Sequence, residues 1–301
     1  MPDWYLSLRG TAAHTLAEYT GAVTAAFGPV TVTSGELNGN PRDFYSREHV
    51  IAADHTVVVA VLENTRGEGD PEASFSPSAK ILADASFRDR MTAWSALVAA
   101  LAPLGLTDDT LASPTVAEMV EDALAEGFMA TAEDLRQRST TAMVQAAPNA
   151  EYVSLVRTAA DPEAVLAACD PAIVTSLSIG AAQFPTLPRG LERFAKLDML
   201  DLHAYQHDVL RGFALPTVTR LSFAWCAIDR LLAEDVAAVP NLTTLILSST
   251  KIGTLDRAIA ARCPRLAVIY IYDTPLAKRP DEIAALLAAW PNLAFQYDGR
   301  R

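Results

Sequence analysis

The stretch "VPNLTTLILSST", residues 239–250, decides how the second half of the chain folds. Pro240 is followed by Leu242, Leu245 and Leu247, and the stretch ends in small polar residues. Proline cannot continue a helix, and apolar residues at alternate positions are typical of a strand with one buried face. We therefore expect the chain to leave a return segment at Pro240 and to enter a short strand.

The same pattern recurs along the second half of the chain. The template L-x-x-L-x-L-x-x-(N/C/T)-x-L can be placed five times, and a partial copy follows. The copies start at Val174, Leu197, Val218, Leu242 and Leu266, and the partial copy starts at Leu293. Successive starts lie 21 to 27 residues apart, and the prolines at 216, 240, 264 and 291 each stand two residues before a start. This pattern resembles the leucine-rich repeat family, whose units run about 20 to 29 residues.

The resemblance implies the fold of residues 148–301. We expect an α/β leucine-rich-repeat solenoid, in which parallel strands alternate with return helices such as "DRLLAEDVAAVPN", "LDRAIAARCPR" and "RPDEIAALLAAWPN". Upstream, "YVSLVRT" reads as a degenerate unit that lacks its third aliphatic, because Arg157 stands there, and that caps the core. Asp161 is expected to be the N-cap of the helix that follows.

Residues 1–147 are expected to form a separate, compact α+β domain, with the boundary at "APNAE". Strands are expected in "DWYLSLRG", "VTVTSG", "HTVVVAVLEN" and "KILADASF", and a polar loop over 65–79. Helices are expected over 11–27, 90–106, 113–128 and 131–147. Thr115 and Glu118 have the spacing of a capping box.

The ninth position of each unit is expected to hold a side chain that bonds to the backbone of the neighbouring turn. Cys226, Thr250 and Thr274 suit that role, whereas Ala182 and Tyr205 depart from it. The first two units are therefore expected to be irregular. Cys226 and Cys263 have a structural explanation and need no reactive or metal-binding role.

Charge and composition exclude several classes of function. Residues 1–150 hold 20 acidic and 9 basic residues, a net −11, whereas the remainder holds 16 and 15, a net −1. An acidic surface repels phosphates, so we expect no nucleic-acid partner. The charge suits a basic protein partner, or solubility alone. No apolar run reaches the ~18–20 residues of a membrane span, no secretory signal is visible, and the three cysteines are scattered, so we expect a cytoplasmic protein with no membrane partner.

The resemblance also implies a binding surface, because outward strand positions in this family form a concave sheet that binds proteins. The candidate partner-binding residues are Met199, Asp201, His203, Arg220, Trp225, Tyr270, Tyr272 and Asp273. Aromatic residues with an arginine are typical of protein-binding hot spots. The alternative is that Trp225 and Tyr270 pack against the front domain or a neighbouring loop.

We expect a non-catalytic protein that binds another protein. A bacterial immunity or inhibitor protein is a narrower form of this hypothesis, suggested by the acidic front half and by the abundance of Ala, and of Arg over Lys. The alternative is an enzyme with an acid/base site in the front domain at Glu48, His49, Asp54 and His55, whose repeats recruit substrate.

No cofactor or metal is expected. His203 and His207 are four residues apart, which on a helix would resemble a metal-binding pair, but the template places them on a strand-to-loop turn. "RGEGD" and "LNGNP" are turns that do not open a helix, as a phosphate-binding loop would require.

Overall fold

A computed structural model describes residues 2–9, 14–37, 45–53, 56–65 and 74–297. The chain divides into two compact units, Met1–Ser139 and Thr140–Arg301. The division falls within helix α4 (Met129–Ala146), upstream of the boundary expected at 147/148. Met143 and Val144, from the last turn of that helix, pack against the apolar core of the second unit.

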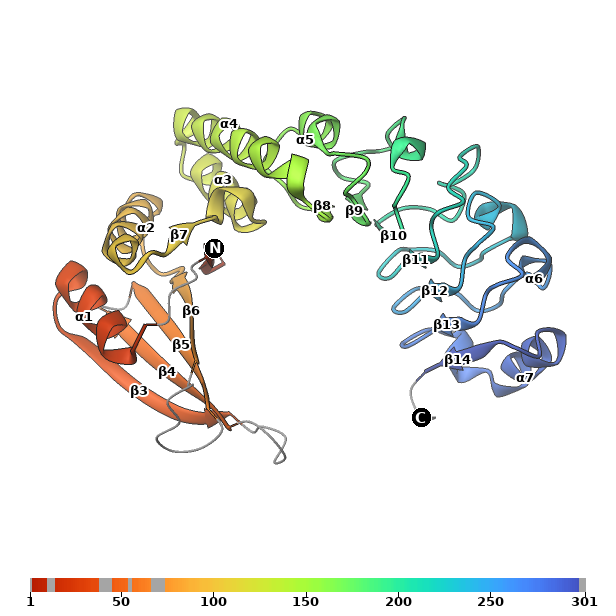
Figure 1. The fold of residues 1–301 in the computed structure, drawn as a ribbon, viewed down its shortest axis with the longest axis horizontal. Helices are drawn as coiled ribbons and strands as arrows, with labels where there is room; N and C mark the ends of the chain where they lie inside the picture. Colours follow the sequence, from red (N-terminus) through yellow and green to blue (C-terminus); the bar gives the residue numbers. More distant parts are fainter. Residues whose placement is uncertain (1, 10–13, 38–44, 54–55, 66–73, 298–301) are drawn as a thin grey trace. The chain divides into compact units, whose positions relative to one another are not determined.

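The first unit contains a five-stranded antiparallel sheet (Figure 1). Its order is β1 (Trp4–Leu6), β6 (Ser74–Ile81), β5 (Val57–Thr65), β4 (Tyr45–Ala53) and β3 (Val30–Leu37). The other elements are the paired strands β2 (Leu8–Arg9) and β7 (Thr107–Asp108), the helices α1 (Leu16–Phe27), α2 (Phe87–Leu101) and α3 (Thr115–Ala125), and the 3₁₀ turns η1 (Ala102–Leu104) and η2 (Thr110–Ala112). The architecture is mixed α/β.

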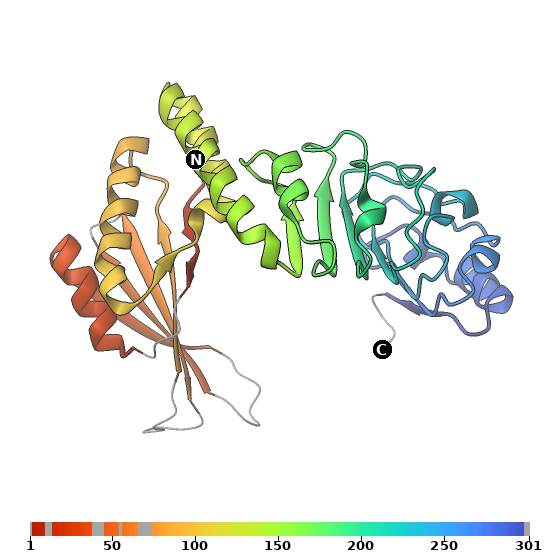
Figure 2. The same ribbon diagram turned by 45° about the horizontal axis from the view of Figure 1, so that its top comes forward.

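Helices α1 and α2 lie side by side over one face of this sheet (Figure 2). Side chains at alternate strand positions, such as Ile51 and Val59, are fully buried, as are Val23 of α1 and Leu97 of α2. Successive side chains of a strand point to opposite faces, so a sheet covered on one side buries every second residue. The strand "HTVVVAVLEN" shows this alternation, although its apolar run suggested burial on both faces.

Three details of the first unit differ from expectation. Strand β4 was not predicted, because "YSREHVIAA" mixes charged and apolar residues. Strand β6 begins at Ser74, inside the expected polar loop, where it pairs with β5. No capping box forms at α3: the Thr115 hydroxyl donates instead to the Tyr5 carbonyl at 2.6 Å, a tertiary hydrogen bond that competes with the local one.

The second unit contains a seven-stranded sheet whose neighbouring strands are all parallel. The strands run in chain order: β8 (Tyr152–Leu155), β9 (Ser176–Gly180), β10 (Met199–His203), β11 (Arg220–Ser222), β12 (Thr244–Ile246), β13 (Val268–Tyr270) and β14 (Ala294–Gln296). Template positions one, four and six are buried in all five copies.

The segments between these strands are only partly helical. They contain α5 (Pro162–Ala168), α6 (Ile259–Arg262), α7 (Pro280–Ala289) and the 3₁₀ turns η3 (Ala147–Asn149), η4 (Leu191–Arg193), η5 (Ala233–Val236) and η6 (Leu276–Lys278). Figure 1 places α5, α6 and α7 on one side of the strands. Of the three segments expected to be helical, α7 forms three turns, whereas the other two form a single helical turn and a 3₁₀ turn. The N-cap at Asp161 is confirmed, since its carboxylate accepts from the backbone N–H groups of Glu163 and Ala164.

The structure resolves the register of both end strands. Tyr152 lies opposite Ser176, so Val153 and Leu155 enter the core and Arg157 does not occupy an inward position. The repeat that contains β8 is therefore less degenerate than expected. In β14, Gln296 lies opposite Tyr270 and Phe295 packs on the core, which places the partial copy one residue out of the expected phase.

Candidate functional site

Five of the eight candidate residues lie in strands of the seven-stranded sheet, whereas Trp225, Tyr272 and Asp273 lie in the turns that follow β11 and β13. Parallel pairing aligns Met199 with Arg220, and Asp201 with Ser222, while Tyr270 lies two strands further along the second row. Neighbouring strands are about 4.8 Å apart, so aligned side chains are adjacent. The rows expected from the template are present.

The eighth template position of four successive repeats has a left-handed backbone conformation. Ala204, Trp225, Ser249 and Asp273 have φ angles between 53° and 63°. These turns are tied together, since the Trp225 N–H donates to the Ser248 carbonyl and the Ser249 N–H donates to the Tyr272 carbonyl. A left-handed conformation is common for Asp but strained for a bulky residue such as Trp.

The backbone of Trp225 is therefore strained, and yet its side chain packs little against the rest of the fold. Its side chain is 74% exposed, the largest exposed fraction among the large hydrophobic residues of the described part. Tyr272 is also exposed, and its ring lies 6.3 Å from that of Tyr270, centroid to centroid. The small residues Ser248 and Ser249 lie between Trp225 and Tyr272 in the register. Within the second unit, this exposure does not fit the alternative in which Trp225 packs against a neighbouring loop, whereas packing against the front domain stays a prediction.

A series of hydrogen-bonded polar side chains lies on the same face of the sheet over β8, β9 and β10. The Asp201 carboxylate accepts from the Ser178 hydroxyl at 3.3 Å and lies 2.8 Å from His203 Nε2. The Tyr152 hydroxyl lies 3.4 Å from Ser178 Oγ. Asp201 Oδ1 is buried without a hydrogen-bond partner among the described residues, so this carboxylate is under-supplied with donors.

Arg220 is already paired within the chain. Its guanidinium donates to Asp198 from two nitrogens, at 2.9 and 3.0 Å, and Asp198 also accepts from the Thr219 hydroxyl. Asp198 and Tyr152 were missed as members of the face, whereas Ser178 stands at a fifth template position, which was expected to point outward. Asp198 occupies the second template position, which the pattern leaves unassigned, and Tyr152 was placed out of register.

The ninth position stabilises the turns in two ways. The Tyr205 hydroxyl donates to the Phe184 carbonyl at 2.6 Å, and the Cys226 thiol donates to the Leu202 carbonyl at 3.0 Å. Each acceptor lies in the repeat that precedes its donor. The hydroxyls of Thr250 and Thr274 bond within their own turns instead. Tyr205 therefore performs the role from which it was expected to depart, whereas the threonines do not link units.

The cysteines are buried and make structural contacts. Burial raises the pKa values of Cys169, Cys226 and Cys263, that of Cys263 to about 11. Burial, with a smaller contribution from Cys226, raises the pKa of Tyr205 to about 12. These groups are neutral at physiological pH, which agrees with a structural role for Cys226 and Cys263.

The histidines that the structure describes are not grouped with two or more other metal-ligating side chains. Among the described residues, no group of three or more His, Cys, Asp or Glu is placed to hold a metal ion. His207 Nε2 accepts from Arg230 at 3.3 Å, away from the Asp201–His203 pair. In the described part of the chain, no helix is long and apolar enough to cross a membrane.

The acid/base cluster expected in the first unit is differently composed. Asp54 and His55 lie outside the described residues. Glu48 and His49 are consecutive in β4, so their side chains point to opposite faces. His49 instead lies between Ser34 and Glu63, each 2.8 Å from one of its ring nitrogens. Sequence separation hid these partners, since antiparallel pairing brings together residues 14 and 15 positions apart.

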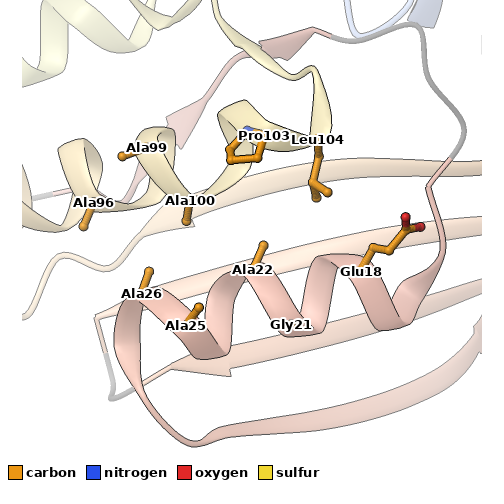
Figure 3. A pocket seen from close by; sticks show the side chains of 10 residues that line it. All are labelled: Glu18, Gly21, Ala22, Ala25, Ala26, Ala96, Ala99, Ala100, Pro103 and Leu104. Carbon is orange, nitrogen blue, oxygen red and sulfur yellow. The ribbon is translucent and has the colours of Figure 1, made fainter.

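A groove lies between α1 and α2, but its lining offers little chemistry (Figure 3). Six of its ten lining residues are alanines. Glu18 is its one charged residue, and that carboxylate belongs to a capping box with Thr15, whose backbone and side-chain hydrogen bonds lower the pKa of Glu18. We assign no function to this groove.

A scan against protein-family models finds no matching family, and a search of curated proteins finds no match. The function is therefore argued from the geometry of the site.

Proposed function

We propose that the chain is a leucine-rich-repeat protein and that the outward face of its parallel sheet binds a protein partner. The family assignment is supported by the template and by the one-strand-per-unit arrangement, and it implies a solenoid with a concave sheet. The observation that carries the proposal of binding is Trp225, a large aromatic side chain exposed on a strained backbone. Non-Gly residues in that conformation are associated with functional sites.

The contact surface consists of Met199, Asp201, His203, Arg220, Trp225, Tyr270, Tyr272 and Asp273. Trp and Tyr provide large contact areas at low entropic cost, and Trp, Tyr and Arg dominate measured hot spots. The rows of the sheet hold these side chains on regular strands and tied turns. Such a surface binds without needing to rearrange, so less of the binding energy is spent on ordering.

The chemistry of the face favours a basic segment of the partner. Arg220 is neutralised by Asp198, which leaves Asp201 and Asp273 as the remaining charged acids of the face. Lys and Arg side chains are attracted both to carboxylates and to the faces of aromatic rings. A basic group of the partner can pair with Asp273 beside Tyr272.

Affinity capture from the native host, followed by mass spectrometry, tests this proposal. Wild-type protein is expected to retain a specific partner, and a variant with Arg220, Trp225 and Tyr270 replaced by alanine is expected to lose it with an unchanged circular dichroism spectrum. Leu287→Ala is a matched control, because Leu287 is exposed on α7 and lies on a return segment instead of a strand. Equal capture by the triple variant would refute the assignment of the face.

A bacterial immunity or inhibitor protein, acting in the cytoplasm, is the narrower form of this proposal. The net charge of −12 suits an inhibitor that masks a basic toxin. A neighbouring gene that encodes a small basic protein would support this form, and an operon of unrelated housekeeping genes would oppose it.

The alternative function is an enzyme whose repeats recruit substrate. The two hydrogen bonds of His49 favour an acid/base site in the first unit, composed differently from the one expected.

A further inference from the structure

Three neighbouring strands of the first unit bring a hydroxyl, an imidazole and a carboxylate into one hydrogen-bonded chain. Ser34 of β3 lies directly opposite His49 of β4, and its Oγ is 2.8 Å from His49 Nδ1. Glu63 of β5 is 2.8 Å from His49 Nε2 through its Oε2. Glu63 lies opposite Arg47, two residues from His49, so all three side chains stand on the same face of the sheet.

The three hydrogen-bonded side chains differ in exposure. His49 is 6% exposed, Glu63 is partly buried, and Ser34 is exposed on the edge strand. A carboxylate only accepts hydrogen bonds, so it selects the tautomer of His49 that carries its proton on Nε2. Nδ1 then has a free lone pair that accepts from the Ser34 hydroxyl.

We propose that Ser34, His49 and Glu63 form a nucleophilic site for acyl transfer, with esters as its substrate class and water as the final acceptor. Ser34 is the nucleophile, His49 the general base, and Glu63 a positioning residue. These are the relations by which such triads are recognised, whatever their order in sequence. The two ring nitrogens exchange roles relative to the serine proteases, which alters no step in the proton balance.

The reaction conserves atoms and charge. Ser34 Oγ attacks the ester carbonyl carbon while its proton passes to His49 Nδ1. The tetrahedral intermediate expels the alcohol, which takes that proton, and an ester bond to Ser34 remains. Water then attacks this ester and gives one proton to Nδ1. The carboxylic acid leaves as Ser34 recovers the proton.

The edge position of β3 supplies access and a donor for the developing oxyanion. Among the described residues β3 pairs only with β4, and an edge strand directs alternate N–H groups outward. Either the N–H of Ser34 or those of Thr33 and Gly35 are therefore unpaired by the sheet. Thr33 and Gly35 lie two strand residues, about 6.6 Å, apart, so in either case a single N–H reaches the oxyanion, one donor fewer than the usual pair. We therefore expect modest turnover of activated esters.

A purely structural role makes a different prediction. If the three groups only fix the register of β3, loss of Ser34 would lower stability and the wild-type hydroxyl would have the low reactivity of an ordinary serine. Reactivity therefore separates the two roles.

The test uses the full chain, a biotinylated fluorophosphonate and p-nitrophenyl acetate. We expect the fluorophosphonate to modify Ser34, as located by peptide mass spectrometry, and Ser34→Ala to abolish labelling and to lower ester hydrolysis about 100-fold. Glu63→Gln keeps a hydrogen-bond acceptor but removes the charge, and it should slow labelling at least about tenfold. Thr31→Ala, an exposed residue on the opposite face of the same strand, should react like the wild type.

A wild-type protein that remains unmodified, or a Ser34→Ala variant that is labelled and turns over ester as fast as the wild type, would overturn the proposal. The site lies in the first unit and the assay contains no partner protein. Its failure would therefore leave the proposed binding function of the repeats untouched.

Discussion

At the scale of single residues, Trp225 combines a strained backbone conformation with an exposed side chain. Replacing it with Asn, which tolerates the left-handed conformation, is expected to raise the free energy of unfolding by about 1 kcal/mol. Little apolar burial is lost, because the ring is largely exposed. Urea denaturation measures the change.

The same Trp225→Asn variant is expected to lose the partner. Gain of stability with loss of binding is typical of a residue retained for function. A marked loss of stability would instead show that the indole packs within the fold, which would contradict its exposure.

The buried thiols give a prediction about pH. With the pKa of Cys263 at about 11, against an ordinary value of 9.0, its thiolate fraction at pH 8 falls about a hundredfold. A disulfide reagent should therefore modify the native protein far more slowly than the urea-unfolded protein. Comparable rates in both states would contradict the burial of these thiols.

The sign of the linked stability follows from the direction of the shift. The folded-state pKa is raised, so the contribution of Cys263 is fully present below pH 9 and is lost as the pH rises through about 11. Tyr205 extends this loss toward pH 12. Thermal unfolding followed from pH 8 to 11 is expected to show a falling melting temperature.

At the scale of elements, close packing between the two repeats that contain β8 and β9 depends on Gly180. A Cβ at this position would lie 2.9 Å from the Val156 carbonyl oxygen, which belongs to the backbone and cannot rotate away. Gly180→Ala is therefore expected to destabilise the second unit by about 1–3 kcal/mol.

Gly253→Ala is the matched control, because a Cβ there meets nothing within 4 Å. It should change the free energy of unfolding by less than about 0.5 kcal/mol. Equal effects of the two substitutions in urea denaturation would contradict the packing of β8 against β9.

The elements that could be predicted were those with a repeated signal. Strands β9 to β13 were located by leucines and valines in phase, because one buried face requires an apolar residue at every inward position. Strand β4 and the start of β6 carry no such phase, since their identity depends on pairing with β5. Two of the three return segments were over-predicted as helices, because their apolar spacing is equally compatible with the single turns that form there, whereas the third forms α7 as expected.

At the scale of the whole molecule, the sequence predicted two units and the rows of one face, but not the partnerships made across the chain. Trp4 and Arg90 both bond to Asp122 in the core of the first unit, over separations of 118 and 32 residues. Ser34, His49 and Glu63 meet in the same way. Such contacts depend on strand order, which local patterns do not encode.

The central claim is that a protein partner binds the sheet face around Trp225 and Tyr270. The most direct test is the dissociation constant of the captured partner, measured by calorimetry for the wild type, the Arg220/Trp225/Tyr270 triple alanine variant and Leu287→Ala. Because hot-spot residues each contribute about 2 kcal/mol or more, we predict at least a 100-fold weaker affinity for the triple variant and an unchanged value for Leu287→Ala. A triple variant that folds normally and binds within about twofold of the wild type would contradict the claim.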